Sequence, residues 1–221
     1  MKIGWIGTGV MGAPMAGHLQ AAGHELFVYN RTSAKAQVLV DAGATLCSSP
    51  REVAENAEII FAIVGFPSDV EATILGLDGV LAGTREGSVV VDMTTSDPSL
   101  AKHIHKTAKA QGADALDAPV SGGDIGARNA TLAIMVGGDQ SVFDRVKPLF
   151  ETLGKNIAYM GPAGSGQHTK MSNQILIAGT MIGVVESLLY ANRAGLDMDA
   201  VIDLIGQGAA GCWSINNLGR R

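Results

Sequence analysis

The sequence predicts an α/β protein with a doubly wound, mostly parallel sheet, followed by an all-α segment that begins with one long helix. Two observations carry this prediction. Up to residue 162, short apolar runs typical of strands alternate with segments of helical spacing and with glycine-rich turns. Beyond the glycine-rich stretch 161–166, residues 167–194 contain no proline and form a dense apolar pattern. We therefore expect a first domain over residues 1–162 and the start of a truncated helical domain over residues 163–221.

The composition restricts the classes of function. The 221 residues carry a net charge of −5 and no run of lysines or arginines, so we expect no nucleic-acid partner. Cys47 and Cys212 are far apart and form no C-x-x-C pattern, which is typical of reduced cysteines in a cytoplasmic protein. The chain shows no signal-peptide pattern before its first apolar run. We therefore predict a cytoplasmic location.

The first predicted strand ends in a glycine pattern. Residues 3–6 are apolar, Gly7, Gly9 and Gly12 follow with G-x-G-x-x-G spacing, and helical spacing begins after them. In a Rossmann-type dinucleotide site, these glycines permit a tight turn, the approach of a pyrophosphate and close helix packing. Free N–H groups at the helix start bind the phosphates. We predict a cofactor loop that also includes Val10 and Met11; a glycine-rich turn without a ligand is the alternative.

The end of the second predicted strand, residues 25–29, indicates which dinucleotide is bound. NAD sites usually place an acidic residue here, whereas NADP sites use arginine for the 2′-phosphate. This chain has Asn30, Arg31 and Thr32 without a carboxylate, and Ser33 is expected to cap a helix over residues 34–42. We predict NADP(H) as the preferred cofactor, with NAD(H) possible. A solvated Arg31 next to a ribose bound by Asn30 is the alternative.

The rest of the first domain continues the alternation. We expect strands near residues 45–47, 59–64, 88–92, 113–118, 131–136 and 156–160, and helices over residues 50–57, 98–111 and 140–153. Ser68 and Asp69 are expected to cap a further short helix after the strand 59–64.

Ser121, Gly122 and Gly123 follow the strand 113–118. Adjacent glycines expose backbone N–H groups, which suits a small anion such as a carboxylate. An ordinary β-turn capped by Ser121 is the alternative.

The second part of the chain is dominated by a predicted helix over residues 167–194. A helix of about 28 residues extends near 42 Å. Residues 175–185 are apolar nearly all round, so we expect them to be buried. This run is shorter than the roughly 20 residues that a membrane span needs, so no membrane partner is predicted. With one further helix expected over 197–207, the apolar surface requires either another subunit or a missing part of the helical domain.

Two polar residues of this helix are candidates for chemistry. Lys170 and Asn173 are three residues apart and share a helix face. A lysine at the mouth of a dinucleotide cleft acts as a general acid or base if burial or neighbours lower its pKa. A solvated helix face is the simpler alternative. His103 and His105 point apart on their helix, so no metal site is predicted.

Four motifs together resemble the β-hydroxyacid dehydrogenase family, the group of 3-hydroxyisobutyrate dehydrogenase, tartronate semialdehyde reductase and glyoxylate/succinic semialdehyde reductases. They are GTGVMGAPMA at 7–16, DMTTSDP at 92–98, DAPVSGG at 117–123 and GSGQHTKMSNQ at 164–174. The resemblance implies that the glycine loop holds the dinucleotide, that Phe66 and Pro67 line the cofactor cleft, and that Thr95 lies beside the nicotinamide ribose.

The same resemblance implies roles in catalysis. Residues 121–123 would bind the substrate carboxylate, Lys170 would be the catalytic lysine, and Asn173 would accompany it. The implied reaction is hydride transfer between NAD(P) and a small β-hydroxyacid or its semialdehyde or keto acid, with Lys170 moving the proton. The implied assembly is a homodimer or homotetramer.

Members of this family carry a longer helical domain with a further lysine on the substrate side, which this chain does not contain. The activity of this chain is therefore open. A non-catalytic dinucleotide-binding module and a sugar-acid enzyme of the 6-phosphogluconate dehydrogenase type are the alternatives.

Overall fold

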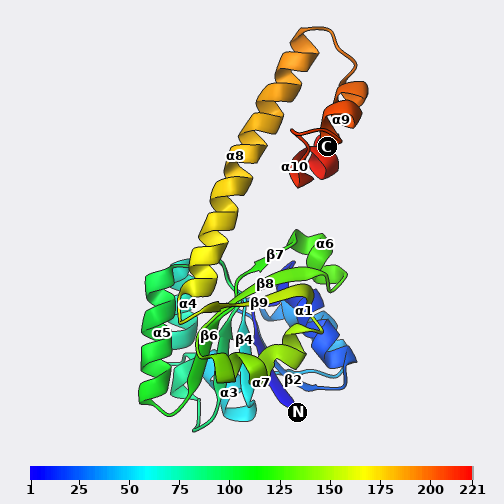
Figure 1. Ribbon diagram of the computed structural model, residues 1–221. Helices are drawn as coiled ribbons and strands as arrows, with labels where there is room; N and C mark the ends of the chain where they lie inside the picture. Colours follow the sequence, from blue (N-terminus) through cyan, green and yellow to red (C-terminus); the bar gives the residue numbers. More distant parts are fainter. Residues whose placement is uncertain (221) are drawn as a thin grey trace. The chain divides into compact units, whose positions relative to one another are not determined.

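The computed structural model describes residues 1–220 (Figure 1). The chain divides into two compact units, Met1–Lys170 and a second unit that begins at Met171. The strands of the first unit are β1 (Lys2–Ile6), β2 (Glu25–Tyr29), β3 (Thr45–Leu46), β4 (Ile59–Ala62), β5 (Val89–Asp92), β6 (Asp114–Asp117), β7 (Val120–Ser121), β8 (Leu132–Gly137) and β9 (Gly154–Gly161). Its helices are α1 (Gly12–Ala21), η1 (Ser33–Ala36), α2 (Gln37–Asp41), α3 (Pro50–Asn56), α4 (Pro67–Leu75), η2 (Val80–Ala82), α5 (Pro98–Ala110), α6 (Gly123–Arg128) and α7 (Gln140–Phe150).

The strands form one sheet in the order β3-β2-β1-β4-β5-β6-β8-β7, and β9 pairs with β8. The pairs from β3 to β6 are parallel, as is the pair of β8 with β9. β8 runs antiparallel to β6 and β7. The predicted doubly wound, mostly parallel sheet is therefore confirmed. Strand order reverses direction at β1, which places a ligand crevice at the carboxyl ends of β1 and β4.

Both faces of the sheet are covered by helices (Figure 1). α1, α2 and α7 pack on one face around a core that includes Trp5 and Phe61, whose rings stack with centroids 5.5 Å apart. α3, α4 and α5 pack on the other face around Ile60 and Val90. Because both faces are covered, β4 and β5 are buried at every position. These apolar runs were recognisable in the sequence for that reason.

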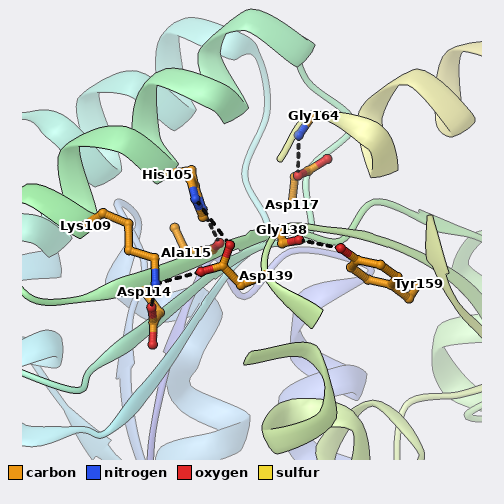
Figure 2. Close-up of polar contacts among 9 residues, drawn as sticks. All are labelled: His105, Lys109, Asp114, Ala115, Asp117, Gly138, Asp139, Tyr159 and Gly164. Atoms are coloured by element: carbon orange, nitrogen blue, oxygen red, sulfur yellow. Dashed lines mark hydrogen bonds and ion pairs between the residues drawn. The ribbon is translucent and has the colours of Figure 1, made fainter. Parts of the chain in front are cut away.

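Polar contacts join α5 to β6 and to the segment between β8 and α7, and join β9 to the same segment, as Figure 2 shows. Lys109 of α5 lies 2.5 Å from Asp114 and 2.7 Å from Asp139, the residue before α7. The His105 ring nitrogens face the Ala115 carbonyl at 3.1 Å and the Asp139 carboxylate at 3.7 Å. Tyr159 donates to the Gly138 carbonyl at 2.9 Å. His105 is thus engaged with the backbone and with a carboxylate.

Several predicted helix starts are confirmed in detail, and two are not. Ser49 accepts from the N–H of Glu52 at 3.1 Å and caps α3. Asp69 accepts from the N–H of Phe66 at 3.0 Å and caps α4. The predicted partner Ser68 does not take part in this capping hydrogen bond. The prediction that Ser33 caps an α-helix over 34–42 is wrong, because Ser33 is itself the first residue of a 3₁₀ turn that precedes α2.

The second unit contains most of α8 (Ser165–Arg193), together with α9 (Met198–Gly206) and α10 (Trp213–Leu218). Its small core joins Val184, Ile202 and Ile215. The expectation that residues 175–185 are buried is wrong for most of them: Ile175 is 75% exposed and Ile182 is 60% exposed. The reason is geometric, since the two short helices cover only the side of α8 that carries Val184.

α8 is also long and apolar enough to cross a membrane by length and composition, with a mean hydropathy of 1.6 over its most apolar window. One such helix is weak evidence, and the absence of a membrane partner stays a prediction.

Candidate functional site

The glycine loop after β1 combines two tightly packed glycines with one open one. A Cβ on Gly7, whose φ is +92°, would lie 2.0 Å from the Ile63 carbonyl oxygen. A Cβ on Gly12 would lie 1.9 Å from the Gly7 carbonyl oxygen, whereas nothing lies within 4 Å of the Cβ position of Gly9. The Thr8 hydroxyl is buried and has no hydrogen-bond partner among residues 1–220. Open space at Gly9 fits the close approach of a dinucleotide pyrophosphate, whereas the Thr8 hydroxyl is shielded from solvent.

A cleft of about 630 Å³ opens at this loop and extends between the tips of β2 and β4 and the start of α4. Val10 and Phe66 line it with side chains that are 72% and 73% exposed, which is high for large apolar residues. The predicted cofactor residues that line the cleft are Gly7, Gly9, Val10, Met11, Asn30, Arg31, Thr32 and Phe66. Gly12, Pro67 and Thr95 are predicted cofactor residues that do not line it.

Asn30 ties the glycine loop to the tip of β2. Its side-chain oxygen accepts from the N–H of Thr8 at 2.9 Å, and its amide nitrogen donates to the Thr32 carbonyl at 2.9 Å. The Asn30 amide thus fixes the position of two neighbouring parts of the cleft.

Three charged groups meet at the end of the cleft near β2. The Arg31 side chain is 87% exposed, and its Nη1 lies 3.4 Å from Asp69 Oδ1. Lys35, on η1, lines the same cleft. Asp69 and Lys35 were not among the predicted site residues, because they come from other elements than the β2 tip. The capping pattern at residues 66–69 is a local signal that could have suggested Asp69, and the position of Lys35 four residues after Arg31 is one that could have suggested Lys35.

The tip of β5 presents one exposed threonine between two buried polar residues. Thr95 is exposed, whereas Thr94 and Ser96 are buried. The N–H of Thr94 donates to Asp92 at 2.9 Å, and the Thr94 hydroxyl oxygen accepts from the N–H of Val64 at 3.0 Å. These bonds join the tips of β4 and β5 and hold Thr95 at the carboxyl edge of the sheet.

Residues 121–123 form a transition from a strand to a helix. Ser121 ends β7, Gly122 and Gly123 have φ values of 134° and 61°, and α6 starts at Gly123. The Gly122 carbonyl accepts from the N–H of Gly126 at 2.9 Å. The positive φ values account for the two glycines, and the N–H groups that open α6 lack partners inside the helix.

Lys170 is the last residue of the first unit and is only 7% exposed. Burial lowers the pKa of its ammonium group below the ordinary value, because charge is poorly solvated there. Asn173 belongs to the second unit, where its amide nitrogen donates to the Gln174 side chain at 2.9 Å. Within residues 1–220, no group of three or more histidine, cysteine or acidic side chains is placed to hold a metal ion.

A glycine loop on the first strand of a doubly wound sheet, with a cleft at its carboxyl edge, defines a nicotinamide-dinucleotide-binding domain. Comparison with known sequences agrees: residues 2–161 match the family described as the NAD binding domain of 6-phosphogluconate dehydrogenase. Residues 164–221 match the NAD-binding domain of NADP-dependent 3-hydroxyisobutyrate dehydrogenase. The chain belongs to the 3-hydroxyisobutyrate dehydrogenase family of NAD(P)-dependent oxidoreductases, and the resemblance inferred from the four motifs is confirmed.

Individual relatives support the same assignment. The chain is 52% identical over 221 residues to a probable mitochondrial 3-hydroxyisobutyrate dehydrogenase-like protein of Arabidopsis thaliana. This match covers 100% of this chain and 66% of that protein. It is 46% identical over 197 residues to 2-hydroxy-3-oxopropionate reductase of Escherichia coli, covering 89% of this chain and 67% of that protein. The structure of Mycobacterium tuberculosis 3-hydroxyisobutyrate dehydrogenase with L-serine has a TM-score of 0.89 at 32% identity, covering 98% of this chain and 73% of that chain. The chain thus spans 66–73% of the length of these three relatives.

Proposed function

We propose that this protein transfers a hydride between NADP(H) and a small β-hydroxyacid, or its semialdehyde or keto acid, with Lys170 as general acid and base. The burial of Lys170 carries the proposal, because burial lowers the pKa of the ammonium group and so makes its neutral, proton-accepting form easier to reach than in an exposed lysine. A lysine in this state can both accept and return a proton. Membership of a family of NAD(P)-dependent oxidoreductases supports the cofactor class.

NADP(H) is the cofactor that we favour, with NAD(H) as the alternative. Arg31, Thr32, Lys35 and Asp69 line one end of the cleft. The two cations and the hydroxyl suit a 2′-phosphate, which would replace Asp69 as the partner of Arg31. The open space at Gly9 suits the pyrophosphate. When bound, the cofactor supplies the nicotinamide carbon that accepts or donates the hydride.

The substrate that we propose is a small carboxylate with a hydroxyl or carbonyl group at the β-position. The names of two relatives support this class, since one reduces 2-hydroxy-3-oxopropionate and the other was solved with L-serine. Ser121, Gly122 and Gly123 would bind the carboxylate, which orients the reacting carbon. Thr95 and Pro67 would border the cofactor.

Lys170 would remove the hydroxyl proton in oxidation and return a proton to the carbonyl oxygen in reduction. In both directions its ammonium form stabilises negative charge that develops on that oxygen. Asn173 would assist Lys170 from the next turn of the same helix.

We also propose that residues 1–162 form the NADP-binding domain and that residues 163–221 begin a helical substrate or dimerisation domain. The two family matches, which meet between residues 161 and 164, support this boundary.

The decisive experiment compares wild type, Lys170→Ala and Lys155→Ala. Reduction of tartronate semialdehyde is followed with NADPH, and oxidation of 3-hydroxyisobutyrate and L-serine with NADP; all three carry the reacting group at the β-carbon. Glyoxylate and succinic semialdehyde, whose carbonyl groups lie at the α- and γ-carbons, test how strictly this position is required. We expect Lys170→Ala to lower kcat by about 100-fold or more with NADPH affinity retained. Lys155→Ala removes an exposed lysine of β9 and should leave both values unchanged. Cofactor binding by the wild type without turnover of any of these compounds would instead favour a non-catalytic dinucleotide-binding module.

A further inference from the structure

Gln167, at the start of α8, connects this helix to the tip of β5. Its side chain is fully buried. Its amide nitrogen donates to the Thr94 carbonyl at 2.7 Å, and its amide oxygen accepts from the N–H of Ser96 at 2.9 Å. The Thr94 carbonyl and the Ser96 N–H belong to the residues directly before and after Thr95. One buried side chain therefore provides the hydrogen-bond partner for the backbone on each side of this exposed threonine.

Asp117, at the end of β6, holds the same helical turn from the other side. Its carboxylate accepts from the N–H of Gly164 at 2.8 Å, as Figure 2 shows, and from the N–H of Gln167 at 2.9 Å. Asp117 is itself buried, with 3% of its surface exposed. Because the N–H groups of a first helical turn have no partners within the helix, this carboxylate fixes where α8 begins.

Two glycines allow the helix start to lie directly on the ends of the strands. A Cβ on Gly166 would lie 2.4 Å from the Met135 carbonyl oxygen and 2.7 Å from that of Asp117, and a Cβ on Gly137 would lie 2.8 Å from the Gly166 backbone nitrogen. The first turn of α8 therefore contacts β6 and β8 through backbone atoms, which leaves little freedom for rotation or translation of that turn.

Lys170 follows Gln167 by three residues in the same helix, so both lie on one side of it. We propose that Gln167, anchored by Asp117, is a positioning residue that sets the place of Lys170 relative to the β5 tip that carries Thr95. The proposal rests on the function proposed above, in which Thr95 borders the cofactor and Lys170 moves the proton. A catalytic lysine must be held to within a fraction of an ångström of its productive position, and buried hydrogen bonds provide that precision.

The chemistry at this position calls for a primary amide. The Thr94 carbonyl requires a donor and the Ser96 N–H requires an acceptor, and glutamine offers both without a charge. Methionine has a similar volume but offers neither. Asparagine keeps both groups but is shorter by one methylene, so it can make the two bonds only if the helix start moves.

The charged groups near this turn are Asp92, Asp117, Asp97, Lys102 and His168. Asp92 and Asp117 end neighbouring strands, the Lys102 side chain would lie 2.9 Å from a Cβ on Gly164, and His168 acts electrostatically on Asp97. The substitutions Gln167→Met and Gln167→Asn leave all of these charges in place, so a change in the titration of Lys170 reports a change in its surroundings. Thr169→Val is the matched control, because it removes a hydrogen bond to the Ser165 carbonyl within the same helix.

The test measures the titration of Lys170 directly, by competitive acetylation of all lysines with acetic anhydride across alkaline pH and mass spectrometry of the peptides. We expect Gln167→Met and Gln167→Asn to raise the pKa of Lys170 towards that of exposed lysines, because a displaced turn admits water. Where turnover is found, kcat should fall by about tenfold or more while KM for NADPH stays within about twofold. Thr169→Val should match the wild type in every value.

Folded Gln167 variants with the wild-type titration of Lys170 and unchanged kcat would overturn the proposal. If Gln167→Met does not fold, Gln167→Asn, which keeps the amide, decides alone. The labelling needs no substrate, so it tests the positioning role even if the wild type turns over none of the compounds. A wild type without turnover would count against the proposed function and not against the positioning role of Gln167.

Discussion

Arg31 and Asp69 form an ion pair at the edge of the cofactor cleft, and its exposure determines its importance. Their side chains are 87% and 31% exposed, so the pair contributes little to stability. A phosphate carries more charge than a carboxylate and offers several acceptor oxygens to a guanidinium group. Arg31 can therefore exchange Asp69 for a 2′-phosphate at little loss.

The corresponding prediction concerns cofactor preference. We expect the wild type to bind NADPH more tightly than NADH, and Arg31→Ala to weaken NADPH binding by about tenfold or more with NADH binding nearly unchanged. Titrations followed by cofactor fluorescence measure both. Arg145→Ala removes the same charge from α7, outside the cleft, and should change neither affinity. Equal affinity of the wild type for both cofactors would show that Arg31 is merely solvated.

Single residues were predictable from the sequence where their role depends on near neighbours in the chain. The spacing of Gly7, Gly9 and Gly12 is determined within six residues, and the structure shows a steric reason for the first and last of them. The pairing of Asp69 with Arg31 and the hydrogen bonds of Gln167 to the β5 tip were not predicted, because each joins segments that are distant in sequence. Only the assembled sheet brings such pairs together.

Among the elements, β5 carries the most perturbed carboxyl group. Burial raises the pKa of Asp92 from 3.8 to about 7, and the charge of Asp117 on the neighbouring strand raises it further, against the hydrogen bonds from Thr94 that lower it. The folded protein therefore keeps a proton on Asp92 at a pH at which the unfolded chain has lost it.

This difference predicts a dependence of stability on pH. Between about pH 4 and pH 7 the folded state binds more protons than the unfolded state, so the free energy of unfolding falls as the pH rises through this range. The shift corresponds to on the order of 4 kcal/mol across the whole window. Urea unfolding at pH 5 and pH 8 spans about two of these three pH units and should show a loss on the order of 3 kcal/mol in the wild type, and a smaller loss in Asp92→Asn. Asp41→Asn changes an exposed carboxyl group and should lose as much stability as the wild type between the two pH values. If Asp92→Asn also loses as much as the wild type, Asp92 is not the group responsible for the pH dependence.

Elements with a continuous apolar run or a clear cap were predictable. β2 has the predicted bounds, and α5 begins after Asp97, which accepts from the N–H groups of Ser99 and Leu100. β7 and α6 were not predicted, since a strand of two residues and a short glycine-containing helix have no periodicity to detect. The helix expected over 34–42 begins as a 3₁₀ turn, a distinction that side-chain spacing does not encode.

For the whole molecule, the exposed side of α8 is the largest departure from what the sequence predicts. The apolar character of residues 175–185 predicts burial, but Ile175, Leu176 and Ile182 are 75%, 69% and 60% exposed in this chain. Periodicity indicates that a surface tends to be covered, and it does not say by what. The same side chains support the prediction that the protein associates.

We predict at least a dimer, as a homodimer or homotetramer. Burying these side chains of α8 against another copy would remove a contiguous apolar surface from water. Light scattering after size-exclusion chromatography measures the state. Ile182→Lys should shift the mass towards the monomer, whereas Val38→Lys, at a position of α2 that is 64% exposed, should not. A monomeric wild type would refute the prediction.

The double hydrogen bonding of Asn30 has a consequence for engineering cofactor preference. An acidic residue at this position would be the obvious change towards NAD, but the present amide donates to the Thr32 carbonyl while it accepts from the N–H of Thr8. A carboxylate could keep the second bond and would repel the carbonyl in place of the first. Redesign is therefore best directed at Arg31 and Lys35, whose replacement leaves the scaffold of the phosphate loop intact.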